Sequence, residues 1–497
     1  MSSKCTFPGL AVAVVAGILL STSSLVAQRE IDVPASAYAG RRATLLERTG
    51  QTPFVAFGEY LIRSGGEGRQ EPNFWYLTGV ESPYAILVVR PDGTPEGSSI
   101  LFLPDSFQFA GAQYPMTDAR FRHAAWNRTI LRLSPGADAA RKLGVDATYP
   151  VDEFAQRLPG LVGDAPVVHV LRDSGRLYAP PGLPAPLSFQ RQMEDGLQSL
   201  LSGAELADAT PVVERMRLVK DEFEIDALRT SAALSAESFV DAMRAIAPGK
   251  NDLEIAGVME AAWKRGGATR AAFSPIVVSG PAAVSLYTLR SEKYNSTDRV
   301  MADGEMIFID YGAAEYDMYT SDVCRTFPVS GRFTSAQRER YEVVLEALEA
   351  AVAEVRPGVM MLDVIKAAAG VFKRHGYDEF EDIDAMGAER VWGLMPSPTY
   401  WIDQRGTLTD YSGARGTGVR DLGHHVGLEA LDSRDYTVPL EPGMVFTIEP
   451  KIYVPDEGLA IMIEDMILVT EDGYENLSAS APKTVEEIER VMQRSRR

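Results

Sequence analysis

Apolar residues in the second half of the chain recur every three or four positions, which is the period of an amphipathic α-helix. The first stripe includes Ile225, Leu228, Phe239 and Ile246 and stops at a Pro-Gly pair, which commonly ends helices. A later stripe begins at Thr334, which forms a capping-box pattern with the glutamine three residues on. The pattern predicts four helices, at residues 225–246, 252–265, 334–356 and 362–375.

Short apolar runs between these helices have the length of buried strands. They lie at residues 276–278, 306–310, 445–449 and 460–469. Two helices and then strands therefore occur twice in succession, which favours an α+β domain with a weak internal duplication. Residues 381–419 are rich in glycine and aromatic residues, and we expect a long loop insertion there.

The first half of the chain has a different pattern. Apolar runs at residues 84–89, 100–103 and 167–171 alternate with helical stretches such as 137–143, which is typical of an α/β layer domain. A chain of 497 residues is too long for one ordinary core. We therefore expect two domains, at residues 28–205 and 206–497.

The first 27 residues resemble a cleaved signal peptide. Lys4 precedes an apolar run of twelve residues, from Gly9 to Leu20, which is short for a membrane span. We expect export to the periplasm or the medium, without stable membrane insertion after cleavage; an uncleaved anchor is the alternative. The net charge of −20 disfavours binding to nucleic acid.

Three acidic residues occupy positions where burial is expected. Asp310 and Glu449 each end an apolar run, and Glu464 lies within one. A buried, unpaired carboxylate costs several kcal/mol, and the flanking residues supply no cation except Lys451. Divalent cations would supply the missing charge.

Two further residues complete a candidate ligand set. Asp322 follows Asp310 after a predicted hairpin, and His424 lies in a Gly-His-His segment. Four carboxylates and one imidazole suit Mn²⁺, Zn²⁺ or Co²⁺, and two such ions can share bridging carboxylates. Each residue alone also has an ordinary interpretation, as a turn cap, a solvated strand edge or a hydrogen-bonded core histidine.

Nearly all of the chain after the leader resembles the aminopeptidase P and prolidase family. The motifs that carry the resemblance are NFWYLTG (73–79), MRLVK (216–220), FSPIVVSG (273–280), FID (308–310), SDVCRTFP (321–328), GH (423–424), EPGM (441–444), TIEP (447–450) and IED (463–465). The resemblance implies a pita-bread catalytic domain preceded by a smaller, creatinase/prolidase-like α/β domain. It also implies a homo-oligomer and two divalent metal ions, with Mn²⁺ first and Zn²⁺ or Co²⁺ as alternatives.

The same resemblance assigns a role to each ligand. Asp310 would chelate one metal, Asp322 and Glu464 would bridge both, and His424 and Glu449 would bind the other. Glu449 and His424 would be the catalytic residues, with Glu449 as general base for the attacking water.

The activity that the resemblance implies is cleavage after the first residue of a peptide whose second residue is proline. A dipeptidase specific for Xaa-Pro remains an alternative. A third interpretation is a metal-binding relative with weak or no peptidase activity.

Departures from the family pattern support that third interpretation. Leu286, Arg420 and Leu431 stand where the family usually has histidines that line the site, and Met462 stands where it usually has arginine. Two residues offer partial replacement, His425 and Arg420, although simple packing of the histidine and solvation of the arginine are the favoured interpretations.

Overall fold

The structure is a computed structural model, and it describes residues 33–58, 69–82, 84–91, 97–109, 112–115, 134–172, 184, 187–285, 298–377, 416–417, 422–432, 438–454 and 457–494. The predicted leader at residues 1–27 and most of the predicted insertion at 381–419 lie outside these ranges. No helix in the described ranges combines the length and apolar character needed to cross a membrane.

A six-stranded mixed sheet forms the centre of the N-terminal part. Its strands lie in the order β6-β3-β2-β1-β7-β8. They are β1 (Phe54–Phe57), β2 (Ile86–Val89), β3 (Ser99–Leu103), β6 (Ala147–Pro150), β7 (Val167–Val170) and β8 (Glu205–Asp208). β8 pairs with β7, so this sheet extends past the boundary expected at residue 205. A separate hairpin consists of β4 (Ser106–Phe109) and β5 (Ala112–Pro115).

Helices accompany this sheet, and apolar side chains lie on both of its faces. Along β1, Phe54 and Ala56 join one core cluster, whereas Val55 and Phe57 join another. Successive strand residues point to opposite faces, so both faces are buried, as an α/β layer requires. The helices are α1 (Ala35–Arg48), α2 (Pro72–Thr78), α4 (Ala137–Leu143), η1 (Val151–Glu153), α5 (Phe154–Val162) and α6 (Phe189–Leu200).

The four helices predicted in the second half are present. They are α8 (Glu222–Ala245), α9 (Asp252–Arg265), α10 (Ser335–Ala353) and α11 (Met361–Arg374). The Thr334 hydroxyl accepts from the backbone N–H of Gln337, and the Gln337 side chain returns to the backbone N–H of Thr334, so the predicted capping box is confirmed. α7 (Thr210–Leu218) leads into α8, and α13 (Val485–Arg494) is the last helix.

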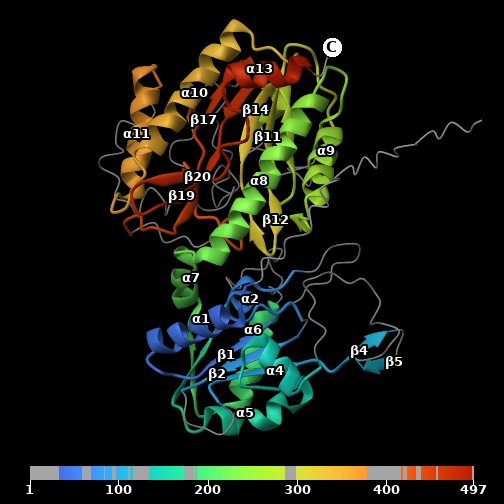
Figure 1. The fold of residues 1–497 in the computed structure, drawn as a ribbon, viewed down its shortest axis with the longest axis vertical. Coiled ribbons are helices and arrows are strands. Elements are labelled where there is room, and N and C mark those ends of the chain that lie inside the picture. Colours follow the sequence, from blue (N-terminus) through green and yellow to red (C-terminus); the bar gives the residue numbers. More distant parts are fainter. Residues whose placement is uncertain are drawn as a thin grey trace, which may run out of the picture. The chain divides into compact units, whose positions relative to one another are not determined.

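In the described ranges, four small sheets lie among these helices. In Figure 1, β11, β14, β17 and β19 lie between the α8–α9 pair and the α10–α11 pair. The sheets are β10-β11-β14, β13-β12-β9, β15-β17-β18 and β16-β19-β20. Their strands are β9 (Arg270–Ala271), β10 (Ile276–Ser279), β11 (Met306–Asp310), β12 (Ala314–Tyr316), β13 (Tyr319–Thr320), β14 (Cys324–Pro328), β15 (Gly416–Thr417), β16 (Val445–Ile448), β17 (Lys451–Val454), β18 (Leu459–Met462), β19 (Asp465–Val469) and β20 (Tyr474–Asn476), with η2 (Gly280–Ser285) after β10.

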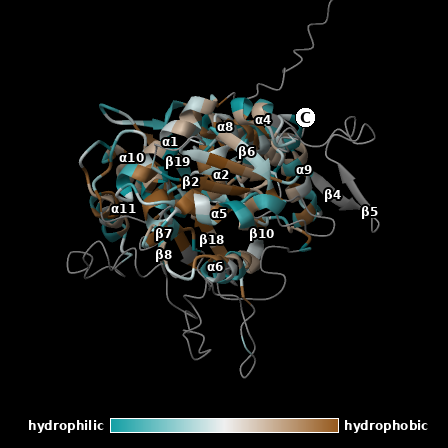
Figure 2. Ribbon diagram, turned by 90° about the horizontal axis from the view of Figure 1, so that it is seen from below, coloured by the Kyte–Doolittle hydropathy of each residue, from teal (hydrophilic) through white to brown (hydrophobic). Residues whose placement is uncertain are grey.

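Two strand predictions differ from the structure. The run 460–469 is two strands, because the chain leaves the sheet of β18 at Met462 and joins the sheet of β19 at Asp465. β2 begins at Ile86, and Tyr84 lies before it with a positive φ of 58° and 61% exposure. Strand interiors are apolar, as the brown of β2 and β18 in Figure 2 illustrates.

Candidate metal centre

Each predicted ligand lies at the end of a strand or in a segment beside one. Asp310 is the last residue of β11, and Glu449 follows β16 directly. Glu464 lies in the two-residue passage between β18 and β19, and Asp322 lies between β13 and β14. His424 lies in a segment beside β16.

A tight hairpin returns the chain from Asp310 to Asp322. β12 and β13 pair with Tyr316 opposite Tyr319, and the two residues between them have positive φ values of 48° and 68°. Two successive positive φ values are characteristic of a two-residue hairpin turn. The predicted hairpin is therefore confirmed, and Asp310 pairs in register with Cys324, two residues beyond Asp322.

Pairing of β16 with β19 brings two acids together. Ile448 lies opposite Asp465 at the end of this ladder, so Glu449 and Glu464 are the next residue on each strand. The backbone N–H of Glu464 donates to the carbonyl of Cys324 at 3.0 Å, which ties the same point to β14.

His424 is fixed by hydrogen bonds to β16. Its carbonyl accepts from the backbone N–H of Thr447 at 2.8 Å, and its own N–H donates to the Thr447 hydroxyl at 3.1 Å. Gly423 approaches this strand so closely that a Cβ would lie 1.9 Å from the Thr447 carbonyl oxygen, at a φ of +153°. Glycine is therefore required immediately before the histidine.

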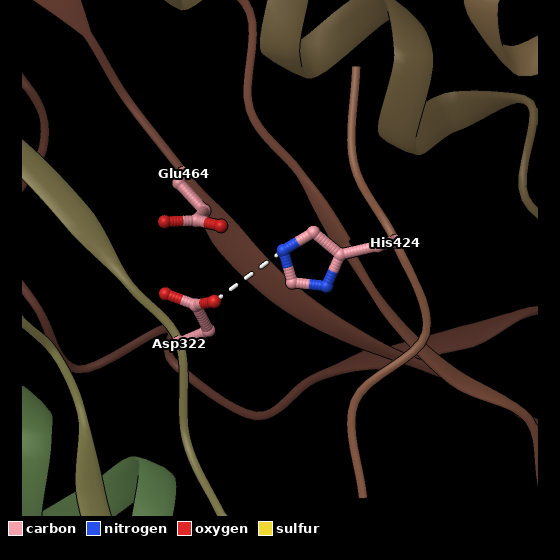
Figure 3. Close-up of side chains that lie close together, drawn as sticks. All are labelled: Asp322, His424 and Glu464. Atoms are coloured by element: carbon pink, nitrogen blue, oxygen red, sulfur yellow. Dashed lines mark ion pairs between the residues drawn. The ribbon is translucent and has the colours of Figure 1, made fainter. Parts of the chain in front are cut away.

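Three of the five side chains form a compact cluster. Asp322, His424 and Glu464 are buried, and each offers a ligand atom within 4.8 Å of the other two. Figure 3 shows the two carboxylates and the imidazole directed toward one another. His424 Nε2 lies 3.4 Å from Asp322 Oδ2 and 3.8 Å from Glu449 Oε1, so Glu449 borders the cluster.

Burial and mutual repulsion make the acids of this cluster difficult to ionise. Burial raises the pKa of Glu464 well above its usual value, and the charges of Asp322 and Glu449 raise it further. The pKa of Asp310 is raised for the same reasons, with burial first and then Asp322 and Glu449. Asp310 therefore shares the electrostatic field of the centre, although it is outside the compact three-residue group.

For His424, the neighbouring carboxylates favour the charged form more strongly than burial disfavours it. Burial lowers the pKa of His424, but its hydrogen bond to Asp322 and the nearby carboxylates outweigh burial and raise that pKa to about 9. An excess of negative charge thus surrounds the ring.

This donor set fits divalent cations. Glu464 Oε2 is buried and has no hydrogen-bond partner among the described residues. A carboxylate oxygen without a partner, next to another carboxylate and an imidazole, has the chemistry of a first-row divalent metal site.

Behind the centre lies a buried ion-pair network that the sequence did not predict. Arg325 on β14 donates to Asp465 Oδ1 at 2.6 Å and also to the backbone carbonyl of Glu464, while Lys483 pairs with the second oxygen of Asp465. Burial opposes ionisation of Asp465, but the two cations outweigh it and lower its pKa to about 2. The two neighbouring acids therefore differ in function: Asp465 is neutralised by Arg325 and Lys483, whereas Glu464 faces the cluster.

A second buried network supports the histidine segment. Asp432 pairs with Arg217 and, at 3.1 Å, with Lys220, and its backbone N–H donates to the carbonyl of His425 at 2.9 Å. Arg217 also donates to Asn73 of α2 at 2.7 Å. The MRLVK motif carried these cations in the sequence, but their partner was not predictable from local pattern.

The described departures from the family pattern lie in apolar or exposed surroundings. Met462 is buried in a cluster with Phe308 and Cys324, and Leu431 is 43% exposed. Leu286 and Arg420 lie outside the described residues. His425 is buried, packs edge-on against Phe446, and has a pKa lowered to about 3 by burial and by the charge of Lys220, which agrees with the packing interpretation.

Comparison with protein families assigns the chain to a class. Residues 226–471 match metallopeptidase family M24, and residues 38–170 match the aminopeptidase P N-terminal domain. The architecture is thus an M24 pita-bread domain preceded by an aminopeptidase P N-terminal domain, and the protein is a metallopeptidase.

Individual relatives narrow the class. The chain is 30% identical over 490 residues to the Xaa-Pro aminopeptidase of Escherichia coli (strain K12), covering 94% of this chain and 99% of the relative. It resembles the structure of E. coli aminopeptidase P with the inhibitor Pro-Leu (29% identity, TM-score 0.70, 93% and 99% coverage) and that of the Zn-substituted enzyme with product (29%, 0.69, 94% and 99%). The chain therefore belongs to the aminopeptidase P family.

Proposed function

We propose that this protein is a dinuclear metallo-aminopeptidase that hydrolyses the peptide bond preceding proline at the N-terminus of peptides. The observation that carries the proposal is Oε2 of Glu464, which has no hydrogen-bond partner in the described part of the chain and lies beside Asp322 and His424. The names of the relatives support the substrate class, since one is a Xaa-Pro aminopeptidase and a similar enzyme was solved with Pro-Leu as inhibitor.

The ligands proposed for the two ions are Asp310, Asp322, His424, Glu449 and Glu464. Asp322 and Glu464 belong to the compact cluster, and the family resemblance gives both of them the bridging role. Asp310 approaches from β11, while His424 and Glu449 approach from β16 and its neighbouring segment. Mn²⁺ is the ion we propose, with Zn²⁺ and Co²⁺ as alternatives; the Zn-substituted relative supports a site that accepts more than one metal.

Bound divalent cations supply Lewis-acid polarisation of the peptide carbonyl and a more acidic attacking water. Glu449 is the residue proposed to accept the water proton, the role that the family resemblance gives it. Its Oε1 lies 3.8 Å from His424 Nε2, beside the cluster. The excess acidity of the centre also suits a substrate with a protonated amino terminus.

A weakly catalytic metal-binding protein is the second candidate. The observations that favour it are Leu431, which is partly exposed, and Met462, which is buried in an apolar cluster, because neither offers a polar group to a substrate. A dipeptidase differs from the main proposal only in the length of peptide accepted. Export after leader cleavage and assembly into a homo-oligomer complete the proposal, on sequence pattern and resemblance alone.

Release of the first amino acid from Xaa-Pro peptides of two, three and six residues, with saturating Mn²⁺, distinguishes these functions. Cleavage of all three lengths supports the aminopeptidase, whereas cleavage of the dipeptide alone supports the dipeptidase. Metal binding without turnover supports the binding protein. Asp322→Asn is the matched inactive control, and activity that survives in this variant contradicts the assigned centre.

A further inference from the structure

Lys451 is a buried cation beside the proposed metal ligands. It is 3% exposed, and its Nζ donates to Glu449 Oε2 at 2.9 Å. The other oxygen of the same carboxylate, Oε1, is the one that lies 3.8 Å from His424 Nε2. The two oxygens of Glu449 thus have different partners.

The strand register places Lys451 opposite an apolar residue. Lys451 of β17 pairs with Met462 of β18, so both side chains lie on the same face of the sheet. Met462 packs in the cluster with Phe308 and Cys324 and occupies a position where the family resemblance leads us to expect arginine. The positive charge of this strand pair therefore lies on Lys451 of β17, and the facing position 462 of β18 is apolar.

The charge of Lys451 reaches other acids of the centre. It opposes the rise in pKa that burial and the neighbouring carboxylates impose on Asp310 and on Glu464. The charge of Lys451 therefore acts on Asp310 and Glu464 through space, in addition to its direct contact with Glu449.

We propose that Lys451 is a positioning residue that holds Oε2 of Glu449 and thereby keeps Oε1 directed toward the metal side of the centre. It replaces, from the opposite strand, a cation that position 462 lacks. This inference rests on the proposed metal centre but not on the proposed substrate.

Repulsion explains why Glu449 needs such a partner. The charge of Glu449 raises the pKa of both Asp310 and Glu464, so a second negative charge near these buried acids is unfavourable. Without Lys451, Oε2 of Glu449 would lose the 2.9 Å hydrogen bond that fixes it, and the carboxylate could turn away from the cluster. Residues that orient metal ligands commonly contribute about 10- to 100-fold to metal affinity or activity.

A double-variant cycle tests the proposal. Mn²⁺ affinity is measured by calorimetry on the full chain for wild type, Lys451→Met, Met462→Arg and the double variant. We expect Lys451→Met to weaken binding by about 10- to 100-fold, and Met462→Arg to restore most of that loss in the Lys451→Met background. Lys451→Gln keeps a hydrogen-bond donor without the charge, and we expect its Mn²⁺ affinity to lie between those of wild type and Lys451→Met. This variant replaces Lys451→Met in the test if Lys451→Met does not fold.

The control removes a lysine charge that is far from the proposed centre in the sequence and exposed to solvent. Lys250→Met removes an exposed lysine paired with Glu254 and is expected to leave Mn²⁺ affinity unchanged. Unchanged or tighter binding in Lys451→Met and Lys451→Gln overturns the proposal, because it means that Lys451 only repels the metal. Peptide cleavage is assayed separately, so wild type that binds Mn²⁺ but does not cleave refutes the substrate proposal alone.

Discussion

Glu464 Oε2 is buried without a hydrogen-bond partner among the described residues, and its carboxyl pKa is raised by burial and by Asp322 and Glu449. Its neighbour Asp465 is equally buried, yet Arg325 and Lys483 lower its pKa. The protein thus supplies cations to one acid of the pair and leaves the other facing acids. Such an arrangement costs folding free energy unless a ligand is bound.

Glu464→Gln separates binding from stability. A raised folded-state pKa means that the ionised form is disfavoured at neutral pH, so replacing it with a neutral amide removes a cost. We expect the metal-free variant to be more stable than wild type by about 1–3 kcal/mol, and stabilisation by Mn²⁺ to shrink strongly. Thermal unfolding with chelator and with Mn²⁺ measures both effects.

Glu342→Gln, at an exposed helix position, is the control and is expected to change neither quantity. A Glu464→Gln protein that loses stability when metal-free and keeps the full Mn²⁺ effect would show that Glu464 is structural.

At the scale of elements, strand ends and one close backbone approach build the centre. The β16–β19 ladder sets Glu449 beside Glu464, and the Gly423 contact with Thr447 sets the position of His424. Ligand geometry therefore depends on backbone packing as well as on the ligands themselves.

Gly423→Ala tests this dependence. The added Cβ would overlap the Thr447 carbonyl, which must shift the segment that carries His424. We expect Mn²⁺ affinity to fall about 10-fold or more, as measured by calorimetry. Gly160→Ala in α5 meets open space and is expected to keep full affinity with equal or slightly higher stability; full affinity in Gly423→Ala would contradict the account.

Local sequence pattern predicted most of the helices and strands that carry the centre, but it missed one change of sheet. The Thr334 cap and the apolar run before Asp310 are local signals, so α10 and β11 were located closely. The change of sheet around Glu464 was missed, because residues 460–469 remain apolar on both sides of it.

Contacts fixed by strand register or tertiary packing could not be predicted from the sequence pattern either. Lys451 meets Met462 only through strand register, and Arg217 meets Asp432 across 215 residues. Neither contact leaves a periodic trace in the sequence, because each is fixed by tertiary packing.

At the scale of the whole molecule, buried charges connect the N-terminal elements to the catalytic ones. Arg217 of α7 contacts Asn73 of α2 and Asp432 of the segment that follows His424. In a separate network, Arg69 pairs directly with Glu315 of β12, and Arg270 pairs with both Glu315 and Glu81. The segment carrying the histidine is thus braced by residues from the first half of the chain.

Asp432→Asn is expected to cost about 3–5 kcal/mol at neutral pH, because it leaves Arg217 and Lys220 buried without their carboxylate. The folded-state pKa of Asp432 is lowered, since Arg217 and Lys220 outweigh burial. Its contribution is therefore present above the unfolded-state pKa of about 4 and is lost as the pH falls through the lower folded value. Urea unfolding of both proteins from pH 7 downward should show the difference narrowing below about pH 4.

Asp226→Asn, at an exposed pair with Arg229, is the matched control and should cost less than about 1 kcal/mol. A difference between wild type and Asp432→Asn that is small, or independent of pH, would mean that this network does not brace the molecule.

The central claim is that buried acids converge here in order to hold divalent cations. Anomalous diffraction from crystals of the protein grown with Mn²⁺ tests it most directly. The account predicts two peaks about 3.5–4 Å apart, with Asp322, His424 and Glu464 among the ligands. Anomalous density absent from these side chains, or located elsewhere on the chain, would contradict it.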